Sequence, residues 1–293
     1  MAILNFGSLN VDRVFRVPRI VRPGETIASS SLGVFAGGKG ANQSVALARA
    51  GAKVAHAGKI GSDGAWLLKK LAGEGIDTRW VRRGTGPTGQ ATIQVDDAGQ
   101  NAIVLVGGAN HEITPDEIDE TLASCAAGSW LLVQNETSAV DHAVRRARER
   151  GLRVAFNPAP FDDRVARYPL KLVDLLCLNE IEGAAMSGQS EPDAIVAELA
   201  ARLPDCEIVL TLGVAGVMRD GPGGRISLDA FSVNAIDATA AGDTFIGYYL
   251  AGLNRGLSTR ESLDLARRAA ALCVTRPGAM DSIPRLDEVL AFV

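Results

Sequence analysis

Asp237-Ala238-Thr239-Ala240-Ala241-Gly242-Asp243 is the stretch that decides what kind of fold and site this chain builds. Its small residues predict a tight turn that leads into the first turn of a helix, with a carboxylate at each end. Backbone N–H groups at a helix start have no partner inside the helix, so such a turn can aim several of them at one anion. Asp243 would project from the first turn toward the same point. The stretch therefore predicts an anion site with a carboxylate beside it.

Length and composition set the outer limits of the interpretation. The 293 residues suffice for one large α/β domain or two ordinary domains, and the 47% hydrophobic content is ample for a sizeable core. A net charge of −4 gives no basic surface for nucleic acid. No apolar segment approaches the ~20 residues that span a bilayer, so we expect no membrane partner. The N-terminal residues read as a strand rather than a signal peptide.

The cysteines and histidines argue against several kinds of chemistry. Cys125, Cys177, Cys206 and Cys273 are widely spaced and form no CxxC pair, which predicts free thiols in a reducing, cytoplasmic compartment. The three histidines have no acidic or cysteine partner at ligand spacing, so a zinc site is not expected. A Gly-x-Ser-x-Gly elbow is absent, which disfavours a serine hydrolase. The base in any reaction is therefore expected to be a carboxylate.

Apolar runs alternate with helical periodicity along most of the chain, which predicts a doubly wound α/β fold with a mostly parallel sheet and helices on both faces. The expected strands are Ile3–Gly7, Val54–Ile60, Trp130–Gln134, Arg153–Asn157, Leu175–Leu178 and Ile208–Thr211. The expected helices are Ala41–Ala50, Ala65–Glu74, Asp116–Ala126, Ala139–Arg150, Glu180–Met186, Ala194–Arg202, Thr244–Leu253 and Thr259–Val274. We expect a single domain over residues 1–293, with ligands beyond the carboxyl ends of the strands.

Two segments, residues 11–36 and 87–106, break this rhythm because they are rich in β-type residues and turns. The second alternates and contains Asp97-Ala98-Gly99-Gln100, which is typical of a hairpin turn. The two segments could pair into a small β-sheet that forms a lid over a ligand cleft. An ordinary antiparallel extension of the main sheet is an equally good interpretation of the pattern.

The glycine-rich run Gly37-Gly38-Lys39-Gly40-Ala41-Asn42 opens the first long helix. It is neither a Walker A motif nor a GxGxxG motif. Its glycines would let a ligand or another chain segment approach the backbone closely. Asn42 lies in the first helical turn, where it can hydrogen-bond a hydroxyl group. Taken alone, such a turn is more often structural than functional.

Polar residues follow several of the predicted strands. Asn10 and Asp12 come after the first strand, and Glu136 ends another, so their side chains could accept hydrogen bonds from the vicinal hydroxyls of a sugar. On spacing alone, a capping or turn role is the better interpretation of Asn10 and Asp12. The acidic residues that follow Asn179 could simply complement a helix N-terminus, or Asn179 and Glu182 could orient the waters of a phosphate-bound Mg²⁺. The loop that begins at Thr211 suits either nucleotide phosphates or a plain hairpin.

Together these segments resemble the ribokinase (PfkB-type) family of carbohydrate and nucleoside kinases, from Asn5 to about Pro284. The specific part of the resemblance is the order of the motifs: Gly37–Asn42, then Asn179-Glu180-Ile181-Glu182, then Thr211-Leu212-Gly213, then Asp237–Asp243. It implies a ribokinase-like fold and a transfer of the γ-phosphoryl group of ATP to a sugar hydroxyl. Within the family, the chain is most similar to the enzymes that phosphorylate O5 of D-ribose.

The resemblance also implies roles for individual positions. Asp243 would be the base, and the amides of Ala240, Ala241, Gly242 and Asp243 would form the anion hole. The implied sugar contacts are Asn10, Asp12, Gly38, Lys39, Asn42, Glu136 and Asp243. The implied ATP contacts are Asn179, Thr211, Gly213, Gly216, Gly242 and Arg267, with Glu182 ordering the waters of Mg²⁺. A monovalent cation, usually K⁺, would lie near Asp237, Thr239, Cys273, Arg276, Gly278 and Ser282.

The resemblance further implies a homodimer formed through the lid. Ala238 and Ala240 depart from the family, which usually has Thr and Gly there, but alanine still offers its N–H group. Gln90 stands where the family is apolar, and a polar side chain over the substrate would favour another pentose or a nucleoside. A different class of function is a sugar-binding protein without catalysis, which the presence of Asp243 disfavours.

Overall fold

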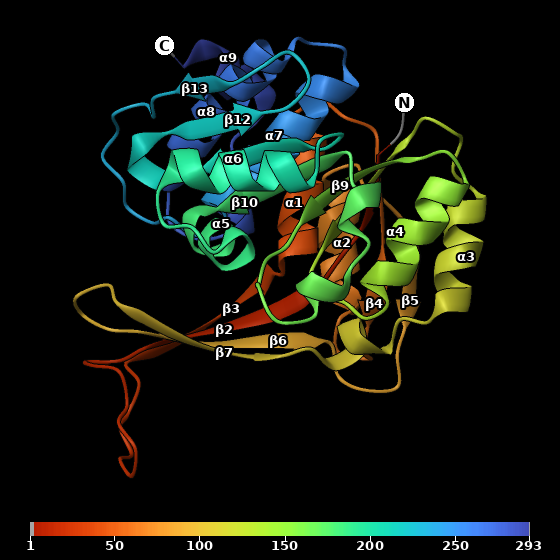
Figure 1. Cartoon of the computed structure of the whole chain (residues 1–293). Helices are drawn as coiled ribbons and strands as arrows, with labels where there is room; N and C mark the ends of the chain where they lie inside the picture. Colours follow the sequence, from red (N-terminus) through yellow and green to blue (C-terminus); the bar gives the residue numbers. More distant parts are fainter. Residues whose placement is uncertain (1–2, 293) are drawn as a thin grey trace.

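The computed structural model describes residues 3–292 and is built around a nine-stranded sheet (Figure 1). The strand order is β13-β12-β11-β10-β9-β8-β1-β4-β5. The strands are β1 (Ile3–Phe6), β4 (Val54–Ile60), β5 (Asp77–Arg83), β8 (Trp130–Gln134), β9 (Arg153–Asn157), β10 (Leu175–Asn179), β11 (Glu207–Thr211), β12 (Val217–Asp220) and β13 (Ile226–Leu228). All neighbours pair in parallel except β11–β12 and β12–β13.

Helices cover both faces of this sheet, and each face has its own apolar core. One core joins the sheet to α1 (Lys39–Arg49), α2 (Ala65–Gly73), α7 (Ala241–Asn254), α8 (Thr259–Val274) and α9 (Leu286–Ala291). The other joins it to α3 (Pro115–Ala123), α4 (Val140–Glu149), α5 (Glu180–Ser187) and α6 (Pro192–Arg202). The near-continuous apolar runs of the central strands follow from this two-sided burial.

A second sheet of four strands, in the order β3-β2-β6-β7, projects from the main body (Figure 1). Its strands are β2 (Asn10–Arg16), β3 (Ser31–Gly37), β6 (Gly89–Val95) and β7 (Asn101–Val106). β2 pairs with β3 in antiparallel and with β6 in parallel orientation, and β6 pairs with β7 as a hairpin. The two segments that break the α/β rhythm therefore meet in one sheet, separate from the main one.

The predicted doubly wound fold is confirmed, and the predicted core strands agree with the observed ones to within a residue or two. The prediction does not include three strands toward the edges of the main sheet, which are β5, β12 and β13. β5 carries four charged residues in seven, so it lacks the apolar run that marks the buried strands. Among the described residues, no helix is long and apolar enough to cross a membrane.

Candidate active site

The run Asp237–Asp243 forms the predicted turn and helix start. Ala240 is the N-cap of α7 and adopts a left-handed conformation, with φ of 61°. The N–H group of Thr244 donates to the carbonyl of Ala240 at 2.8 Å, and that of Ala241 donates to the carbonyl of Ala238 at 3.2 Å. Helix geometry leaves the amides of Gly242 and Asp243 without a partner inside the helix. These two amides are the ones free to bind an anion, while the amide of Ala241 stabilises the turn.

Asp243 is buried, with 8% of its surface exposed, and its carboxylate is bound by two side-chain amides. Nδ2 of Asn42 donates to Oδ2 at 3.0 Å, and Nε2 of Gln43 donates to Oδ1 at 2.9 Å. Burial raises the pKa of Asp243, while the Lys39 ammonium and the two amides oppose that rise because they favour the charged form. The site thus contains a buried carboxylate whose ionised form has three donors or cations around it.

The glycine-rich run brings α1 against the end of β1. Gly38 has φ of 94°, and a Cβ there would lie 3.0 Å from the carbonyl oxygen of Ser8. A Cβ on Gly40 would lie 2.3 Å from the nitrogen of Ser8, which no side chain could tolerate. Only glycine fits this close approach of α1 to the end of β1. The approach fixes the start of α1, from which Asn42 and Lys39 interact with Asp243 on α7. Oδ1 of Asn42 is buried without a hydrogen-bond partner among the described residues, so it is an open acceptor.

Two further carboxylates lie beside Asp243. Glu136 accepts hydrogen bonds from the Ser8 hydroxyl and, at 3.0 Å, from the Lys39 amide. Burial raises the pKa of Asp12 to about 7, and the charges of Glu136 and Asp243 add to that rise. Burial also raises the pKa of Glu136, against the effect of Lys39. The structure therefore brings Asp12, Glu136 and Asp243 within electrostatic reach of one another, and the half-buried ammonium group of Lys39 acts on Glu136 and Asp243.

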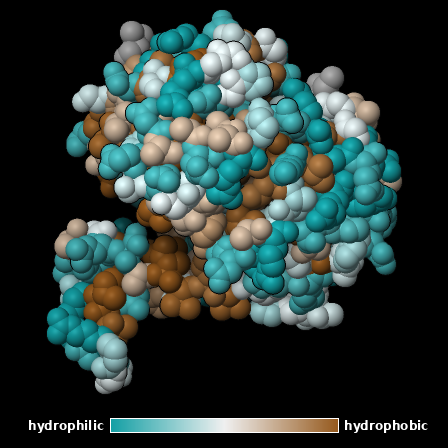
Figure 2. Space-filling model, in the orientation of Figure 1, coloured by the Kyte–Doolittle hydropathy of each residue, from teal (hydrophilic) through white to brown (hydrophobic). Residues whose placement is uncertain are grey.

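Asn10 and Glu136 line a cavity of about 170 Å³ that opens between the second sheet and the main body. Figure 2 shows the hollow between these two parts. Asn10 is 6% exposed, and its Oδ1 accepts a hydrogen bond from Nδ2 of Asn110 at 2.8 Å. The remaining lining residues are Leu105, Val106, Gly107, Asn110, His111, Asn135, Pro160 and Arg164. Polar groups converge at one end of a small cavity, as a hydroxylated ligand requires.

Gln90, the residue expected to place a polar side chain over the substrate, does not share a face of the second sheet with Asp12. Directly paired residues share a face of a sheet, and alternate residues lie on opposite faces. Asp12 pairs with Ala91, whereas Gln90 pairs with Val11 and Val106. Gln90 therefore lies on the opposite face of the second sheet from Asp12. The alternation within β6 therefore places Ala91, rather than Gln90, on the face of the second sheet that carries Asp12.

On the other side of Asp243, Asn179 and Glu182 form a capping box at the start of α5. Oδ1 of Asn179 accepts from the Glu182 amide at 2.9 Å, and Oε2 of Glu182 accepts from the Asn179 amide at 3.0 Å. Both residues therefore stabilise the start of α5. Burial raises the pKa of Glu182, and Lys39 lowers it, which places this carboxylate within electrostatic reach of the site.

The loop after β11 has the glycine conformations that the sequence indicates. Gly216 has φ of 104°, and a Cβ there would lie 2.1 Å from the carbonyl oxygen of Leu228. Gly213 also has positive φ, and Oγ1 of Thr211 donates to the Leu178 carbonyl at 3.4 Å. The loop is therefore folded closely against the end of β13 and the residues that follow it.

Arg267, the predicted ATP contact on α8, is engaged within the chain. Its guanidinium forms an ion pair with Asp264 at 2.6 Å and donates to the carbonyl of Asp229 at 2.6 Å. It also lies 4.4 Å from the ring centroid of Phe231. The guanidinium therefore fixes the 229–231 segment against α8, and a nucleotide would meet it through its exposed side.

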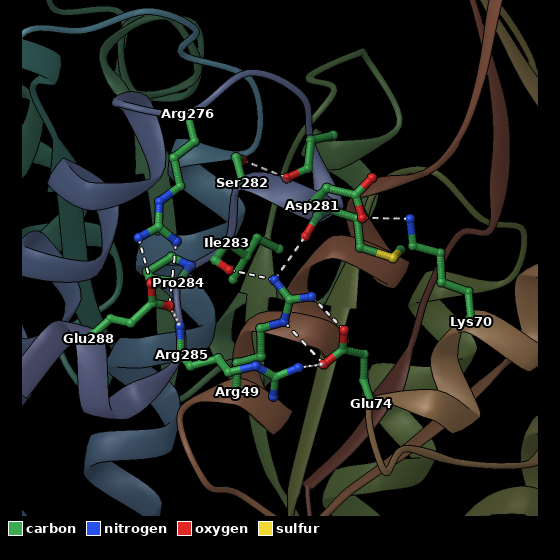
Figure 3. A network of polar contacts seen from close by, with 12 residues as sticks. Arg49, Lys70, Glu74, Arg276, Asp281, Ser282, Ile283, Pro284, Arg285 and Glu288 are labelled. Atoms are coloured by element: carbon green, nitrogen blue, oxygen red, sulfur yellow. Dashed lines mark hydrogen bonds and ion pairs between the residues drawn. The ribbon is translucent and has the colours of Figure 1, made fainter.

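The predicted cation residues gather in one loop cluster, with one exception. Oδ1 of Asp237 accepts from the hydroxyl and amide of Thr239, and Oδ2 accepts from the amide of Gly278 at 2.9 Å. Cys273 and Ser282 lie 3.1 Å apart, sulfur to oxygen. The side chain of Arg276 instead turns to Glu288, at 2.6 Å (Figure 3). Arg276 could therefore contact a cation only through its backbone carbonyl. The other residues of this cluster would also bind a cation through backbone carbonyls.

Four buried amides behind Asp243 were not identified from the sequence: Asn5, Gln43, Gln134 and Asn157. Gln134 and Asn157 are the last residues of β8 and β9, and Gln43 directly follows the glycine-rich run. A polar residue at the carboxyl end of a buried strand is the signal that could have found two of them, because ligands of doubly wound folds bind at that edge.

Comparisons with known proteins agree with this geometry. The model of the pfkB family of carbohydrate kinases matches residues 2–286. A ribokinase from Haemophilus influenzae is 38% identical over 296 residues, which cover 98% of this chain and 96% of that protein.

Solved structures of high similarity include ribokinases from two eukaryotes. The structure from Cryptococcus neoformans var. grubii, in complex with ADP, has a TM-score of 0.86 and 35% identity, with 100% of this chain and 99% of that chain covered. The structure from Arabidopsis thaliana, with ribose and ATP, has a TM-score of 0.87 and 28% identity, with 100% and 99% covered. With its fold, its buried Asp243 and these full-length matches, this chain belongs to the pfkB family of carbohydrate kinases.

Proposed function

We propose that this chain transfers the γ-phosphoryl group of ATP to the O5 hydroxyl of D-ribose and gives ribose 5-phosphate. The observation that carries the proposal is the position of Asp243. It is buried in the first turn of α7, beside free backbone N–H groups, and its carboxylate accepts hydrogen bonds from the side-chain amides of Asn42 and Gln43 in α1. Relatives named ribokinase cover nearly the whole chain, and one similar structure is a complex with ribose and ATP.

Ribose would lie in the cavity between the second sheet and the main body. Asn10 and Glu136 line this cavity, and Asp12 and Asn42 lie beside Asp243. All four would offer acceptors to the sugar hydroxyl groups, and the Oδ1 of Asn42, which has no partner among the described residues, would accept from one of them. Gly38 and Lys39 would complete the sugar site through the close approach of the backbone. The second sheet would act as the lid of this site. Ala91, rather than Gln90, would face the sugar.

Asp243 would accept the proton of the O5 hydroxyl as that oxygen attacks the phosphorus atom. The hydroxyl must then lie about 2.6–3.2 Å from the carboxylate. Charge spreads over the transferring group in the transition state, so donors aimed at it supply most of the rate. The free amides of Gly242 and Asp243 are those donors, with Ala240 and Ala241 shaping the turn that presents them.

ATP would bind across the carboxyl ends of β10 and β11. The residues that would contact it are Asn179, Thr211, Gly213, Gly216, Gly242 and Arg267. Mg²⁺ neutralises phosphate charge and keeps most of its water shell, and Glu182, held by its capping box, would accept hydrogen bonds from those waters. K⁺ would bind beside the helix start, through the carbonyl-rich cluster of Asp237, Thr239, Cys273, Arg276, Gly278 and Ser282.

The second sheet would also form a homodimer contact with a second copy of this chain. Seven large apolar side chains of this sheet are exposed, and β7 is an edge strand without a charged residue (Figure 2). These residues are Leu32, Val34, Phe35, Ile103, Val104, Leu105 and Val106. An open apolar edge of this kind needs a cover, and a two-fold pair supplies it. The four free cysteines fit a reducing cytoplasm.

An ATP-consumption assay over pentoses, hexoses, deoxyribose and nucleosides, with and without K⁺, tests the proposal. We expect ribose to be the preferred acceptor. Asp243→Asn should lower kcat by about 10²–10⁴-fold while ribose binding persists, because only the proton acceptor is removed. Near-normal turnover by this variant would refute the role of Asp243, and preference for a nucleoside would refute the choice of acceptor.

A further inference from the structure

A chain of buried amide side chains lies directly behind Asp243. Asn5 belongs to β1, Gln43 to α1, Gln134 to β8 and Asn157 to β9. Their exposed fractions are between 0% and 4%. Nε2 of Gln134 donates to Oε1 of Gln43 at 2.7 Å, and Nε2 of Gln43 donates to Oδ1 of Asp243 at 2.9 Å. The carboxylate is thus connected to the interior of the main sheet through hydrogen bonds.

A backbone carbonyl at the far end fixes the direction of this chain. Nδ2 of Asn5 donates to the carbonyl of Gly40 at 2.7 Å, and a carbonyl can only accept. Oδ1 of Asn5 must therefore face Gln134, whose Nε2 donates to it at 3.0 Å. The same Nε2 donates to Oε1 of Gln43, so the NH₂ group of Gln43 must face Asp243.

Asn157 completes the assignment of the Gln43 amide. Nδ2 of Asn157 donates to the carbonyl of Cys177 at 3.0 Å, so its Oδ1 accepts from Nε2 of Gln43 at 3.1 Å. The two N–H groups of Gln43 therefore have separate acceptors, Asn157 and Asp243. Gly7 packs closely against Gln134, since a Cβ on Gly7 would lie 2.5 Å from Oε1 of Gln134. The side chain of Gln134 therefore has little space in which to change its orientation.

We propose that Gln43 is a positioning residue for Asp243: oriented by Asn5 and Gln134, its side-chain N–H fixes one carboxylate oxygen and favours the ionised carboxylate that the reaction needs. The proposal rests on the proposed role of Asp243 as the base. Asn42 donates to the other carboxylate oxygen from the same helix turn, but its own orientation has no such chain behind it.

The electrostatic surroundings make this donor consequential. Burial raises the pKa of Asp243, and Lys39, Gln43 and Asn42 oppose that rise. The other titratable groups that interact with Asp243 come from β2, the turn after β8, α5 and α8, and are Asp12, Glu136, Glu182 and Cys273. Removing the Gln43 donor leaves these groups in place, so the pKa of Asp243 should rise further and a smaller fraction should be ionised at a given pH.

The test is the pH dependence of ribose phosphorylation by Gln43→Met, which keeps the side-chain length and removes the donor. We expect the acidic limb of the kcat profile to move up by about one pH unit, so that kcat on this limb falls about tenfold. The KM for ribose should stay within about threefold. An unchanged limb in the folded variant would overturn the proposal.

Asn157→Leu is the matched control, since it removes a buried amide that contacts Gln43 but not Asp243. It should lower the thermal unfolding midpoint without moving the acidic limb, and an equal shift in both variants would reduce Gln43 to a packing role. Gln43→Glu covers the case in which the methionine variant does not fold, because it keeps the shape of the side chain.

A second carboxyl group against Oδ1 should move the acidic limb upward, since two adjacent carboxylates cannot both ionise freely. A wild-type profile in Gln43→Glu would refute the proposal. If the wild-type protein does not phosphorylate ribose at all, the proposed acceptor fails first, and that result is separate from any effect at Gln43.

Discussion

At the residue scale, Asp12 links the sugar site to the pH dependence of stability. Its pKa is raised from the ordinary 3.8 to about 7, mainly by burial. Between these two values the folded state binds more protons at this residue than the unfolded chain does. The free energy of unfolding must then fall as the pH rises through this window, because deprotonation leaves a buried charge beside Glu136. This contribution opposes the usual effect of salt-bridged carboxylates.

Asp12→Asn should remove this effect. At pH 8 we expect the free energy of unfolding to exceed that of the wild-type protein by about 1–2 kcal/mol, with a higher thermal unfolding midpoint, and at pH 5 we expect a smaller difference. Ribose binding should weaken at both values. Differential scanning calorimetry at the two pH values measures the change, with Asp97→Asn in the exposed β6–β7 turn as the control. Equal effects at pH 5 and pH 8 would contradict the titration of Asp12 in this window.

At the scale of elements, one arginine joins α1, the end of α2 and the segment that carries Ser282 (Figure 3). Arg49 ends α1, and its side chain and that of Glu74 are 11% and 12% exposed. Nε of Arg49 donates to Oε2 of Glu74 at 3.1 Å, and Nη1 donates to the carbonyl of Met280 at 3.2 Å. The guanidinium therefore connects both helices to the loop beside the proposed cation site.

Arg49→Met should lower the free energy of unfolding by on the order of 2–4 kcal/mol, because it leaves the carbonyl of Met280 without this donor and the largely buried carboxylate of Glu74 with only the longer contact to Arg285, at 3.4 Å. The double variant Arg49→Met, Glu74→Met should recover part of this loss, since the uncompensated charge is gone. Urea unfolding of the single and double variants measures the coupling. A single variant within 0.5 kcal/mol of the wild type would show that the contact contributes little to the fold.

At the scale of the whole molecule, the second sheet decides the proposed association. Val104 is 66% exposed on the edge strand β7, so Val104→Lys should convert the proposed dimer into a monomer. Val214, which is 100% exposed in the loop after β11, offers a matched control, and Val214→Lys should leave the dimer intact. Sedimentation velocity of the three proteins distinguishes these outcomes. A wild-type monomer at high concentration would rule out this interface.

The core strands and the main site motifs could be predicted because they follow local rules. Buried parallel strands are apolar runs, and a glycine before a helix start signals close approach whatever surrounds it. The direction of Gln90 could not be predicted, because a side chain on a strand faces whichever way the pairing register dictates. Gln43 and Gln134 escaped notice because their partners lie far apart in the sequence, 91 positions in that pair. Such contacts exist only after the sheet has assembled.

The second sheet joins the main body at Asn10, Gly37 and Gly89. Asn10, the first residue of β2, pairs with Gly37 at the end of β3 and with Gly89 at the start of β6. Three of the four strands of the second sheet therefore begin or end together beside the cavity. β1 ends only a few residues before, at Phe6, and α1 begins two residues after Gly37. A rigid-body rotation of the second sheet about this junction would necessarily carry Asp12 with it, while Asp243 stays with α7. The tilt of the sheet therefore sets the separation between Asp12, a proposed sugar contact, and Asp243, the proposed base.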